Sequence, residues 1–519
     1  MGLIVTILCG VGVLASFLNP IWASCYFVFV QVFRPNEHVE GVKFPVLPVM
    51  IVTMAVVYFI HMNRKLPRPK ASSQRTLGLM ALMVVLLVAH LLLWHRELLM
   101  DWILGEAAPL LLFALFATRF MSSPERLHSM FSSVGVGSAI IGGQALGVHF
   151  LAKQPLTMFK DQFGDMLVSH GKLWDLYHLY HDRESPERYS VRLQGRGTGT
   201  WGNSNDLAMV CNWGVPAAIY YLRRKGSMLL KAVGAGVMLM LMATIFLTGS
   251  RGNQVQLGIN LWMIFVGGRR KALGIVLLVI AVIGALVILP RLQPERADAG
   301  ASSGEREKLL LEAGRMFIHN PVKGVGFMNF QDQAFKTLMP HNVYAQCLAE
   351  TGLVGAMIFF PLIFFLRRDA ARSVKYFESG GSFNNAMLAR CVGSMQFAFL
   401  VFMLFTNQFM RFTFGLVMAC AMALYVAMMR DREKAGAAAG EATGAPPPDE
   451  AAVEAVGRPV VPQDYRLERR QPLELQPHRG GGARYVFDPD APDHGVRPVD
   501  DEEPDDFDDI DDDPYRRRR

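Results

Sequence analysis

Residues 76–93 read TLGLMALMVVLLVAHLLL, a stretch without a single Asp, Glu, Lys or Arg. As an α-helix it would extend about 27 Å, close to the thickness of a bilayer's hydrocarbon core. Comparable stretches recur through the first 429 residues, and 51% of the whole chain is hydrophobic. A soluble fold cannot bury so many helices that are apolar on all sides. The sequence therefore predicts an all-α polytopic integral membrane protein.

The apolar stretches number 12 or 13, because the first two are short and are separated only by Asn19-Pro20. They lie near residues 3–18, 21–33, 44–61, 76–93, 98–118, 134–152, 205–222, 228–248, 252–268, 272–290, 344–366, 386–406 and 411–429. We expect 12 or 13 transmembrane helices from this pattern.

Lysine and arginine side chains concentrate in four of the connections, which predicts that these connections face the cytoplasm. They are residues 62–75, 223–231, 269–271 and 367–375. The resulting arrangement puts two long loops on the periplasmic side. The predicted organisation is N-terminal transmembrane helices at 1–152, a periplasmic loop at 153–204, transmembrane helices at 205–290, a large periplasmic loop at 291–343, C-terminal transmembrane helices at 344–429 and a cytoplasmic tail at 430–519.

The charge is divided unevenly along the chain. Residues 431–519 hold 13 basic and 23 acidic side chains, a net charge of −10, so the rest of a chain with +7 overall carries +17. The tail's low hydrophobicity and its blocks of like charge predict disorder. A basic membrane region points to anionic lipids or an anionic substrate as partners, and nothing indicates nucleic acid. Cytoplasmic anchoring explains most of this excess, but it does not explain arginines predicted on the periplasmic side, which include Arg192, Arg196, Arg251, Arg291, Arg296, Arg306 and Arg315.

The sequence gives no indication of a metal or a cofactor. The six cysteines form no CxxC pair, and the predicted periplasmic loops contain no DxD motif or cluster of His and carboxylate residues. The letters of residues 197–202, GTGTWG, match a dinucleotide-binding pattern, but no buried strand precedes them and a membrane helix follows. The N-terminus lacks a basic region before its apolar run, so we expect the first helix to be retained.

Arg251 lies in TGSRG at 248–252, a tight turn between two predicted helices on the periplasmic side. One interpretation is that its long side chain simply reaches to the membrane interface. The other is that its guanidinium holds a lipid phosphate with two parallel hydrogen bonds. Local sequence does not decide between them.

His341 follows Pro340 and precedes Asn342, where the large loop returns to the membrane. A single histidine is more often a surface or core residue than a catalytic one. Its ordinary pKa near neutrality nevertheless makes it the natural general base in this loop. Glu350 falls in the first turns of the following helix, where an ionisable side chain is costly unless it is paired or functional. It would either orient His341 or pair with an arginine.

Several strings in fixed order resemble the bacterial O-antigen ligase/polymerase membrane family. They are TGSRG at 248–252, NPVKGVG at 320–326 with Phe330, HNVY at 341–344 and ETGL at 350–353, preceded by Arg196 and GNSNDLA at 202–208. The start of the chain, NP at 19–20 and RPNE at 34–37, is similar to putative O-glycosylation ligases associated with exosortase systems. The resemblance covers about residues 1–429 and leaves the tail out.

The resemblance implies a glycosyltransferase of the bacterial inner membrane that takes glycan from a polyprenyl-pyrophosphate carrier and needs no metal. The departing pyrophosphate requires cations and the acceptor hydroxyl requires a base. His341 is the candidate catalytic base, and the candidate substrate-binding residues are Arg196, Arg251, Arg306, Asn342 and Glu350. Of these, the assignment of Arg306 is looser than that of His341.

Three acceptors remain open, namely the hydroxyl of a lipid, of another glycan or of a protein. The alternative function is a transporter or flippase for a lipid-linked or anionic solute, which would place charged residues near the middle of the membrane. A scaffold that works through its tail is a third possibility. The positions of Arg251 and His341 discriminate between the first two.

Overall fold

The computed structural model describes fifteen segments of the chain. They are residues 2–33, 45–62, 71–121, 123–151, 156–160, 166–170, 176–181, 189–190, 204–266, 299–334, 339–380, 382–407, 409–443, 485–487 and 496–498. The chain divides into two units, Met1–Pro459 and Val460–Arg519. The described residues of the second unit form a single antiparallel pair of strands, β5 (Tyr485–Phe487) and β6 (Val496–Pro498).

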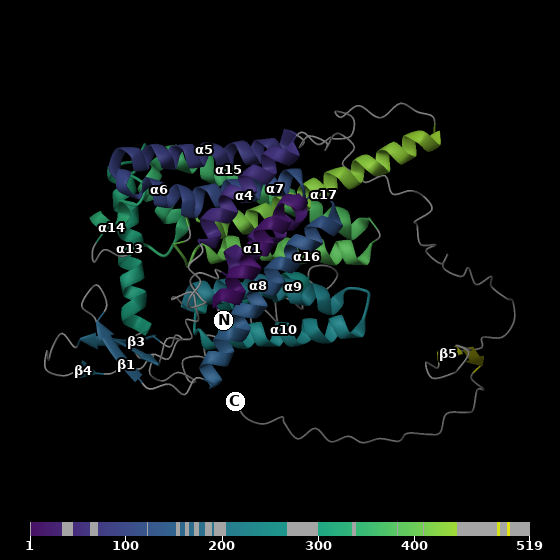
Figure 1. Ribbon diagram of the computed structural model, residues 1–519, viewed down its shortest axis with the longest axis horizontal. Coiled ribbons are helices and arrows are strands. Elements are labelled where there is room, and N and C mark those ends of the chain that lie inside the picture. The colour runs from purple at the N-terminus through teal and green to yellow at the C-terminus, as the bar shows by residue number, and fades with distance from the viewer. Residues whose placement is uncertain are drawn as a thin grey trace, which may run out of the picture. The chain divides into compact units, whose positions relative to one another are not determined.

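The first unit is built mainly of helices (Figure 1). Those before residue 200 are α1 (Gly2–Leu18), α2 (Pro20–Phe33), α4 (Val46–Met62), α5 (Ala71–Trp94), η1 (Arg96–Leu98), α6 (Leu99–Trp102), η2 (Ile103–Ala107), α7 (Ala108–Arg119) and α8 (Pro124–Leu151). Those after it are α9 (Ser204–Arg223), α10 (Met228–Leu247), α11 (Arg251–Val266), α13 (Ala299–His319), α14 (Phe330–Gln333), α15 (Val343–Ser379), α16 (Phe383–Phe402) and α17 (Phe412–Thr443).

The prediction of a polytopic helical membrane protein is confirmed. Within the described residues, seven helices are long and apolar enough to cross a membrane, and three shorter apolar helices lie near the N-terminus. The seven spans are Ser73–Trp94, Arg96–Arg119, Pro124–Gly147, Met228–Leu247, Val343–Ser379, Phe383–Phe402 and Phe412–Ala437. One predicted segment, 272–290, lies outside the described residues, so the predicted total of 12 or 13 stays a prediction.

Several boundaries differ from the predicted ones. The basic stretch 367–375 continues α15 as far as Ser379, because Leu366, Ala370, Ser373 and Phe377 repeat at helical spacing and are buried on one face. Helix α17 similarly runs to Thr443, past the predicted start of the tail at residue 430. Part of the predicted loop 153–204 forms an antiparallel sheet in the order β1 (Leu156–Lys160), β2 (Met166–His170), β3 (Leu176–His181) and β4 (Tyr189–Ser190).

Helices α9 and α11 coincide with predicted apolar segments, yet neither is among the seven spans. Helix α11 is short, with 16 residues, and α9 carries polar residues along its length. Both hold buried amide side chains, including Asn212 in α9 and Gln256 in α11. These two helices therefore bring several amide side chains into the bundle interior.

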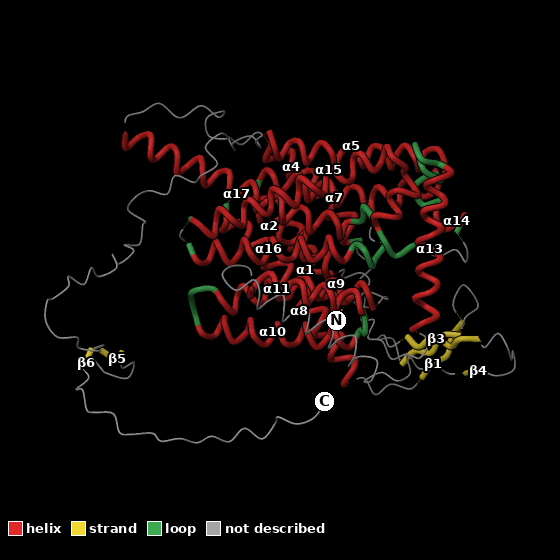
Figure 2. The backbone as a smooth tube through the Cα atoms, turned by 180° about the vertical axis from the view of Figure 1, so that it is seen from behind, coloured by secondary structure: helices red, strands yellow, loops and turns green. Residues whose placement is uncertain are grey.

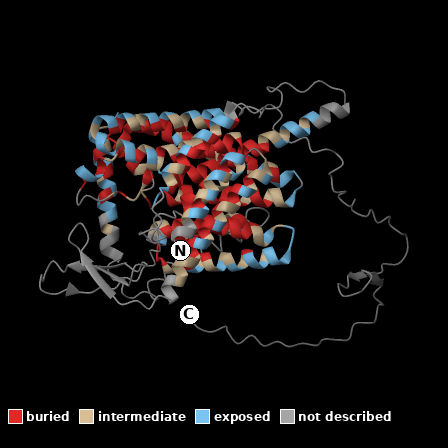
Figure 3. Cartoon of the chain, viewed as in Figure 1, coloured by how far each residue is buried: buried red, intermediate tan, exposed pale blue. Residues whose placement is uncertain are grey.

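The core lies along α17 and its neighbours (Figure 3). In α17, 94% of the most apolar part of the helix is buried inside the protein. In α10 the buried share is 22%. Helix α10 thus presents most of its apolar surface outward, as expected for a helix that faces lipid. Helix α13 runs across the ends of α5 and α15 instead of alongside them, as Figures 1 and 2 both show.

Candidate functional site

The loop NPVKGVG pairs with a break in helix α15. The carbonyls of Ala349 and Glu350 accept hydrogen bonds from the N–H groups of Val325 (2.9 Å) and Gly326 (3.0 Å). In the other direction, Leu353 N–H donates to Pro321 (2.8 Å) and Val354 N–H donates to Val322 (3.1 Å). The helix can offer these groups because its backbone leaves the helical conformation at residue 352. Two motifs that are distant in sequence therefore form one structural unit.

Glycines occur where the two backbones approach most closely. A Cβ atom on Gly324 would lie 2.4 Å from the carbonyl carbon of Glu350, and one on Gly352 would lie 2.4 Å from the oxygen of Val322. Gly352 also has φ 61° and ψ −157°, a conformation essentially restricted to glycine. The glycines at both positions are explained by this contact.

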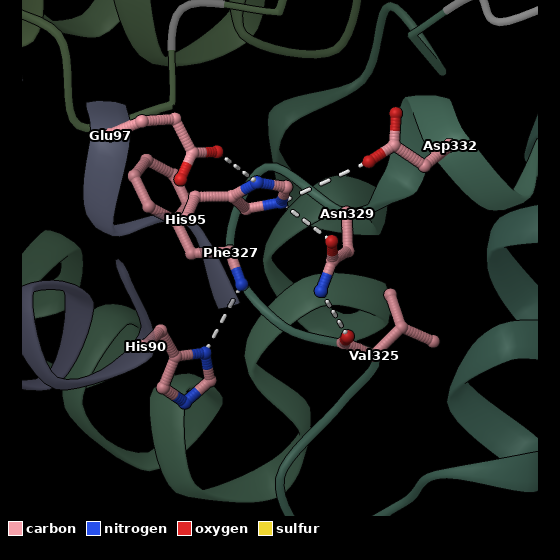
Figure 4. A network of polar contacts seen from close by, with 7 residues as sticks. All are labelled: His90, His95, Glu97, Val325, Phe327, Asn329 and Asp332. Carbon is pink, nitrogen blue, oxygen red and sulfur yellow. Dashed lines mark hydrogen bonds and ion pairs between the residues drawn. The ribbon is translucent and has the colours of Figure 1, made fainter. Parts of the chain in front are cut away.

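Helix α5 and His95, which directly follows it, hold the same loop from the other side (Figure 4). The buried His90 accepts a hydrogen bond at Nδ1 from the N–H of Phe327 (3.1 Å), and His95 Nε2 lies 2.6 Å from Asn329 Oδ1. Asn329 donates through Nδ2 to the carbonyl of Val325 (2.9 Å), so its Oδ1 is the acceptor and His95 is the donor.

Two carboxylates flank the His95 ring. Glu97 Oε1 lies 3.3 Å from Nδ1, and Asp332 Oδ2 lies 3.9 Å from Nε2. Neither histidine stands out in the sequence. His90 is a lone polar residue within an apolar run, and a pattern of that kind carries no information about a partner 237 positions away.

Packing of α13 brings Arg306 to this unit. Leu309, Ala313 and Met316 lie on one face of α13 and form a small apolar cluster with the loop residues Val325 and Phe330 and with Ala349 of α15. Arg306 lies one turn before Leu309, and its side chain is exposed. The cluster thereby fixes this arginine relative to the start of α15.

His341 lies directly before α15 and is half-buried. Its φ of 46° is left-handed, an uncommon conformation for a residue other than glycine and one that tends to occur at functional sites. Burial lowers the pKa of the His341 imidazole, and the positive charge of Arg306 lowers it further. The partial positive charge at the start of α15 acts in the same direction. His341 is therefore neutral at pH 7 and able to accept a proton.

Asn342 caps helix α15. Its side chain accepts a hydrogen bond from Ala345 N–H (3.0 Å), while the N–H of Val343 donates to the carbonyl of Met403 (2.9 Å). The helix start is thus attached to the end of α16. A role for Asn342 in substrate binding stays a prediction.

Arg251 begins α11 and its side chain is exposed. Gly249, with φ 62°, makes the turn, and Gly252 packs so closely that a Cβ atom would lie 2.9 Å from Cβ of Phe405. The segment 402–405 therefore contacts both the Arg251 turn and, through Met403, the start of α15. Arg251, Arg306 and His341 lie at the same end of the bundle.

Glu350 is fully buried beneath the loop. Gln346 Nε2 donates to its Oε2 (3.2 Å), and the N–H groups of Met328 and Phe330 face the carboxylate, although Oε1 has no partner within hydrogen-bonding geometry. The described contacts of Glu350 are thus with α15 and the loop, and pairing with His341 or an arginine stays a prediction. Arg196 lies outside the described residues. Within them, no group of three or more His, Cys, Asp or Glu residues is arranged to hold a metal.

Comparison with known families confirms the resemblance. Residues 217–360 match the family model described as O-Antigen ligase, so this part of the chain is similar to the O-antigen ligases. The matched region contains Arg251, Arg306, His341, Asn342 and Glu350, and it ends before α16. It contains neither Arg196 nor His90 and His95. No curated protein matches the chain.

Proposed function

We propose that this O-antigen ligase-like membrane protein transfers a glycan from a polyprenyl-pyrophosphate carrier to an acceptor hydroxyl at the periplasmic face of the inner membrane. His341 removes the proton from the hydroxyl, whose oxygen then attacks the anomeric carbon of the donor sugar. The bond between that carbon and the pyrophosphate oxygen breaks, and the pyrophosphate leaves on its lipid. Arg251, Arg306 and Arg196 stabilise the negative charge that develops on it.

One observation carries this proposal. A neutral, half-buried histidine stands beside the positive charge of Arg306, at the end of the bundle where Arg251 also lies. A general base must be unprotonated at working pH so that it can accept a proton, and an anionic leaving group needs nearby cations. His341 would supply the base and Arg306 a cation in one place, without a metal.

The same arrangement favours the enzyme over the transporter. A transporter for an anionic solute would hold its cations near the middle of the membrane, within interrupted helices. Here Arg251 and His341 lie at helix starts and Arg306 lies on a helix that crosses the ends of α5 and α15. These are positions from which a base and cations reach substrates at the membrane surface.

Purified protein in lipid vesicles, supplied with a polyprenyl-pyrophosphate glycan and one acceptor class at a time, tests the proposal. We expect transfer to one of the three acceptors, and loss of transfer in His341→Ala. The matched control is His319→Ala, which removes an exposed histidine from α13. Near-normal transfer by His341→Ala would exclude this residue as the base.

The proposed binding of the donor pyrophosphate by Arg251 has its own test. Arg251→Lys keeps the charge but not the two parallel donors of a guanidinium, so we expect weaker donor binding and slower turnover. Arg315→Lys makes the same change at an exposed arginine of α13 and serves as the control. Wild-type donor affinity and turnover in Arg251→Lys would show that the Arg251 guanidinium does not hold the pyrophosphate.

A further inference from the structure

Buried polar atoms without partners concentrate on three neighbouring helices. Among the described residues, 17 buried side-chain nitrogen and oxygen atoms lack a hydrogen bond, and ten of them belong to α9, α11 and α16. They are Asn212 Oδ1, Trp213 Nε1, Asn260 Oδ1, Trp262 Nε1 and both amide atoms of Gln254, Gln256 and Gln396. The side chains of Asn212, Gln256, Asn260 and Gln396 are all completely buried.

On α9 and α11 these side chains form a continuous series. Asn253 Nδ2 donates to Asn205 O and Ser250 Oγ, both at 2.9 Å, beside the Arg251 turn. Asn212 Nδ2 donates to the carbonyl of Asn253 (3.0 Å), and Asn260 Nδ2 donates to the carbonyl of Asn212 (3.3 Å).

Gln256 extends this series along α11. It lies three residues after Asn253 and four before Asn260, so the three side chains share one face of the helix. The seven residues from Asn253 to Asn260 span about 10 Å along the helix.

Helix α16 brings Gln396 to the same level. The two helices run in opposite directions, because Gly252 contacts Phe405 at one end and Arg390 Nη1 donates to the carbonyl of Ile264 (3.5 Å) at the other. Residue 396 lies between these two contacts, opposite the second half of α11. Trp213 of α9 meets Phe399 of α16, with ring centroids 6.5 Å apart, so all three helices pack together.

Direct hydrogen bonds between α9 and α11 satisfy only part of this series. Polar side chains inside membranes usually join helices by hydrogen bonds to one another, and an unpaired buried amide is costly. Gln256 and Gln396 bond to no protein group at either amide atom. Water molecules satisfy buried groups of this kind when two to four polar partners surround them. We propose that ordered water molecules fill the space between α9, α11 and α16, as a hydrated polar column that begins beneath Arg251.

Gln31 in α2 provides an internal comparison. It is also completely buried and lacks hydrogen-bond partners at both amide atoms. No other buried side-chain nitrogen or oxygen atom of α2 lacks a partner. A single amide offers a water molecule too few partners, so the proposal assigns water to the column and not to Gln31. The proposal does not depend on the glycan-transfer function.

X-ray radiolytic labelling of the intact protein in lipid nanodiscs tests for the water directly, because hydroxyl radicals form from bound water beside the side chains they modify. Trp213, which follows Asn212 in α9 and has an unpartnered Nε1, and Met54 of α4 are both 0% exposed. Methionine is readily oxidised, so Met54 is a demanding comparison. We expect Trp213 to be modified several-fold faster than Met54. Equal, background labelling of the two residues overturns the proposal.

A pair of substitutions gives a second measurement. Gln256→Met removes hydrogen bonds to the column water and leaves that water short of partners, so the melting temperature should fall. Gln31→Met removes an unpaired amide from an apolar site and should raise it. A rise for Gln256→Met that equals the rise for Gln31→Met shows a dry interior and overturns the proposal.

Discussion

The loop at residues 320–330 and the interior between α9, α11 and α16 both hold polar groups away from solvent, but they satisfy these groups in different ways. In the loop, the N–H groups of Val325, Gly326 and Phe327 all bond to protein atoms. In the interior, Gln256 and Gln396 bond to none. The loop is thus fixed by directional contacts from α5 and α15. In the interior, protein contacts satisfy Asn212 Nδ2 and Asn260 Nδ2, and the proposed water satisfies the remaining amide atoms.

We call the loop at residues 320–330 together with the start of α15 the fixed side. The difference bears on function because His341 directly precedes α15 and so belongs to this region. The residues after it start α15, whose first turns bond to the loop and to Met403. A base that acts on a precisely positioned hydroxyl needs such a support. In the interior, by contrast, Gln256 and Gln396 are attached to no protein group, so their positions depend on packing and on the proposed water.

Gly352→Ala should have the largest effect, because it breaks the fixed side at its centre. The new methyl group would meet the oxygen of Val322 at 2.4 Å, in a backbone conformation that alanine rarely adopts. We expect a loss of about 3–5 kcal/mol in the free energy of unfolding, together with loss of glycan transfer. Denaturant unfolding in detergent measures the first quantity.

Gly314→Ala is the matched control. Gly314 lies in helix α13 and has no atom within 4 Å of its added Cβ position. Alanine favours the helix, so this substitution should raise stability by up to about 1 kcal/mol. Equal effects of the two substitutions would contradict the role given to the contact between loop and helix.

His90→Leu should have the next largest effect, because it leaves the N–H of Phe327 buried without an acceptor. Loss of a buried hydrogen bond in this way costs about 1–3 kcal/mol. His319→Leu, at an exposed position on α13, should change the unfolding free energy little. A wild-type denaturation midpoint for His90→Leu would show that α5 does not hold the loop.

These two positions also show what the sequence reveals and what it hides. The string ETG at 350–352 was recognisable as part of a motif, although its reason for being there, the approach of Val322, became visible only in three dimensions. His90 gave no signal at all. Its importance comes from the hydrogen bond that joins α5 to the loop, between His90 and Phe327, which are 237 positions apart. Periodicity within one segment cannot predict such a pair.

The same limit applies to the helix boundaries and the polar interior. Hydropathy predicts the start of α15 correctly but ends the helix at residue 366, because the arginines that follow are typical of a loop. One face of that stretch is nevertheless buried. Asn212 and Gln256 are present in predicted spans, yet only their shared face between α9 and α11 makes them notable. His341, Arg306 and Arg251 were expected on one face of the membrane, and they lie at one end of the bundle.

Asn342→Ala should have a smaller effect, which separates capping from substrate binding. Loss of the side-chain hydrogen bond to Ala345 N–H should reduce stability by about 1 kcal/mol. Asn342→Ser keeps a capping oxygen and should retain nearly all of it. If Asn342→Ser is as stable as the wild type but transfers glycan slowly, Asn342 also contacts substrate. Equal destabilisation by both substitutions would contradict the capping role.

Arg306→Gln should affect stability least, since Arg306 is exposed, but it should change the titration of His341. The arginine's positive charge disfavours a protonated imidazole, so its removal should raise the pKa of His341, while burial continues to hold that pKa below its usual value. Diethylpyrocarbonate reacts with neutral histidine, and its rate at His341, followed by mass spectrometry, rises as pH passes upward through that pKa. The midpoint should therefore move to higher pH in Arg306→Gln and stay in place in Arg315→Gln. Identical midpoints in wild type and Arg306→Gln would mean that the fixed side does not hold this arginine close enough to His341 to act on its proton.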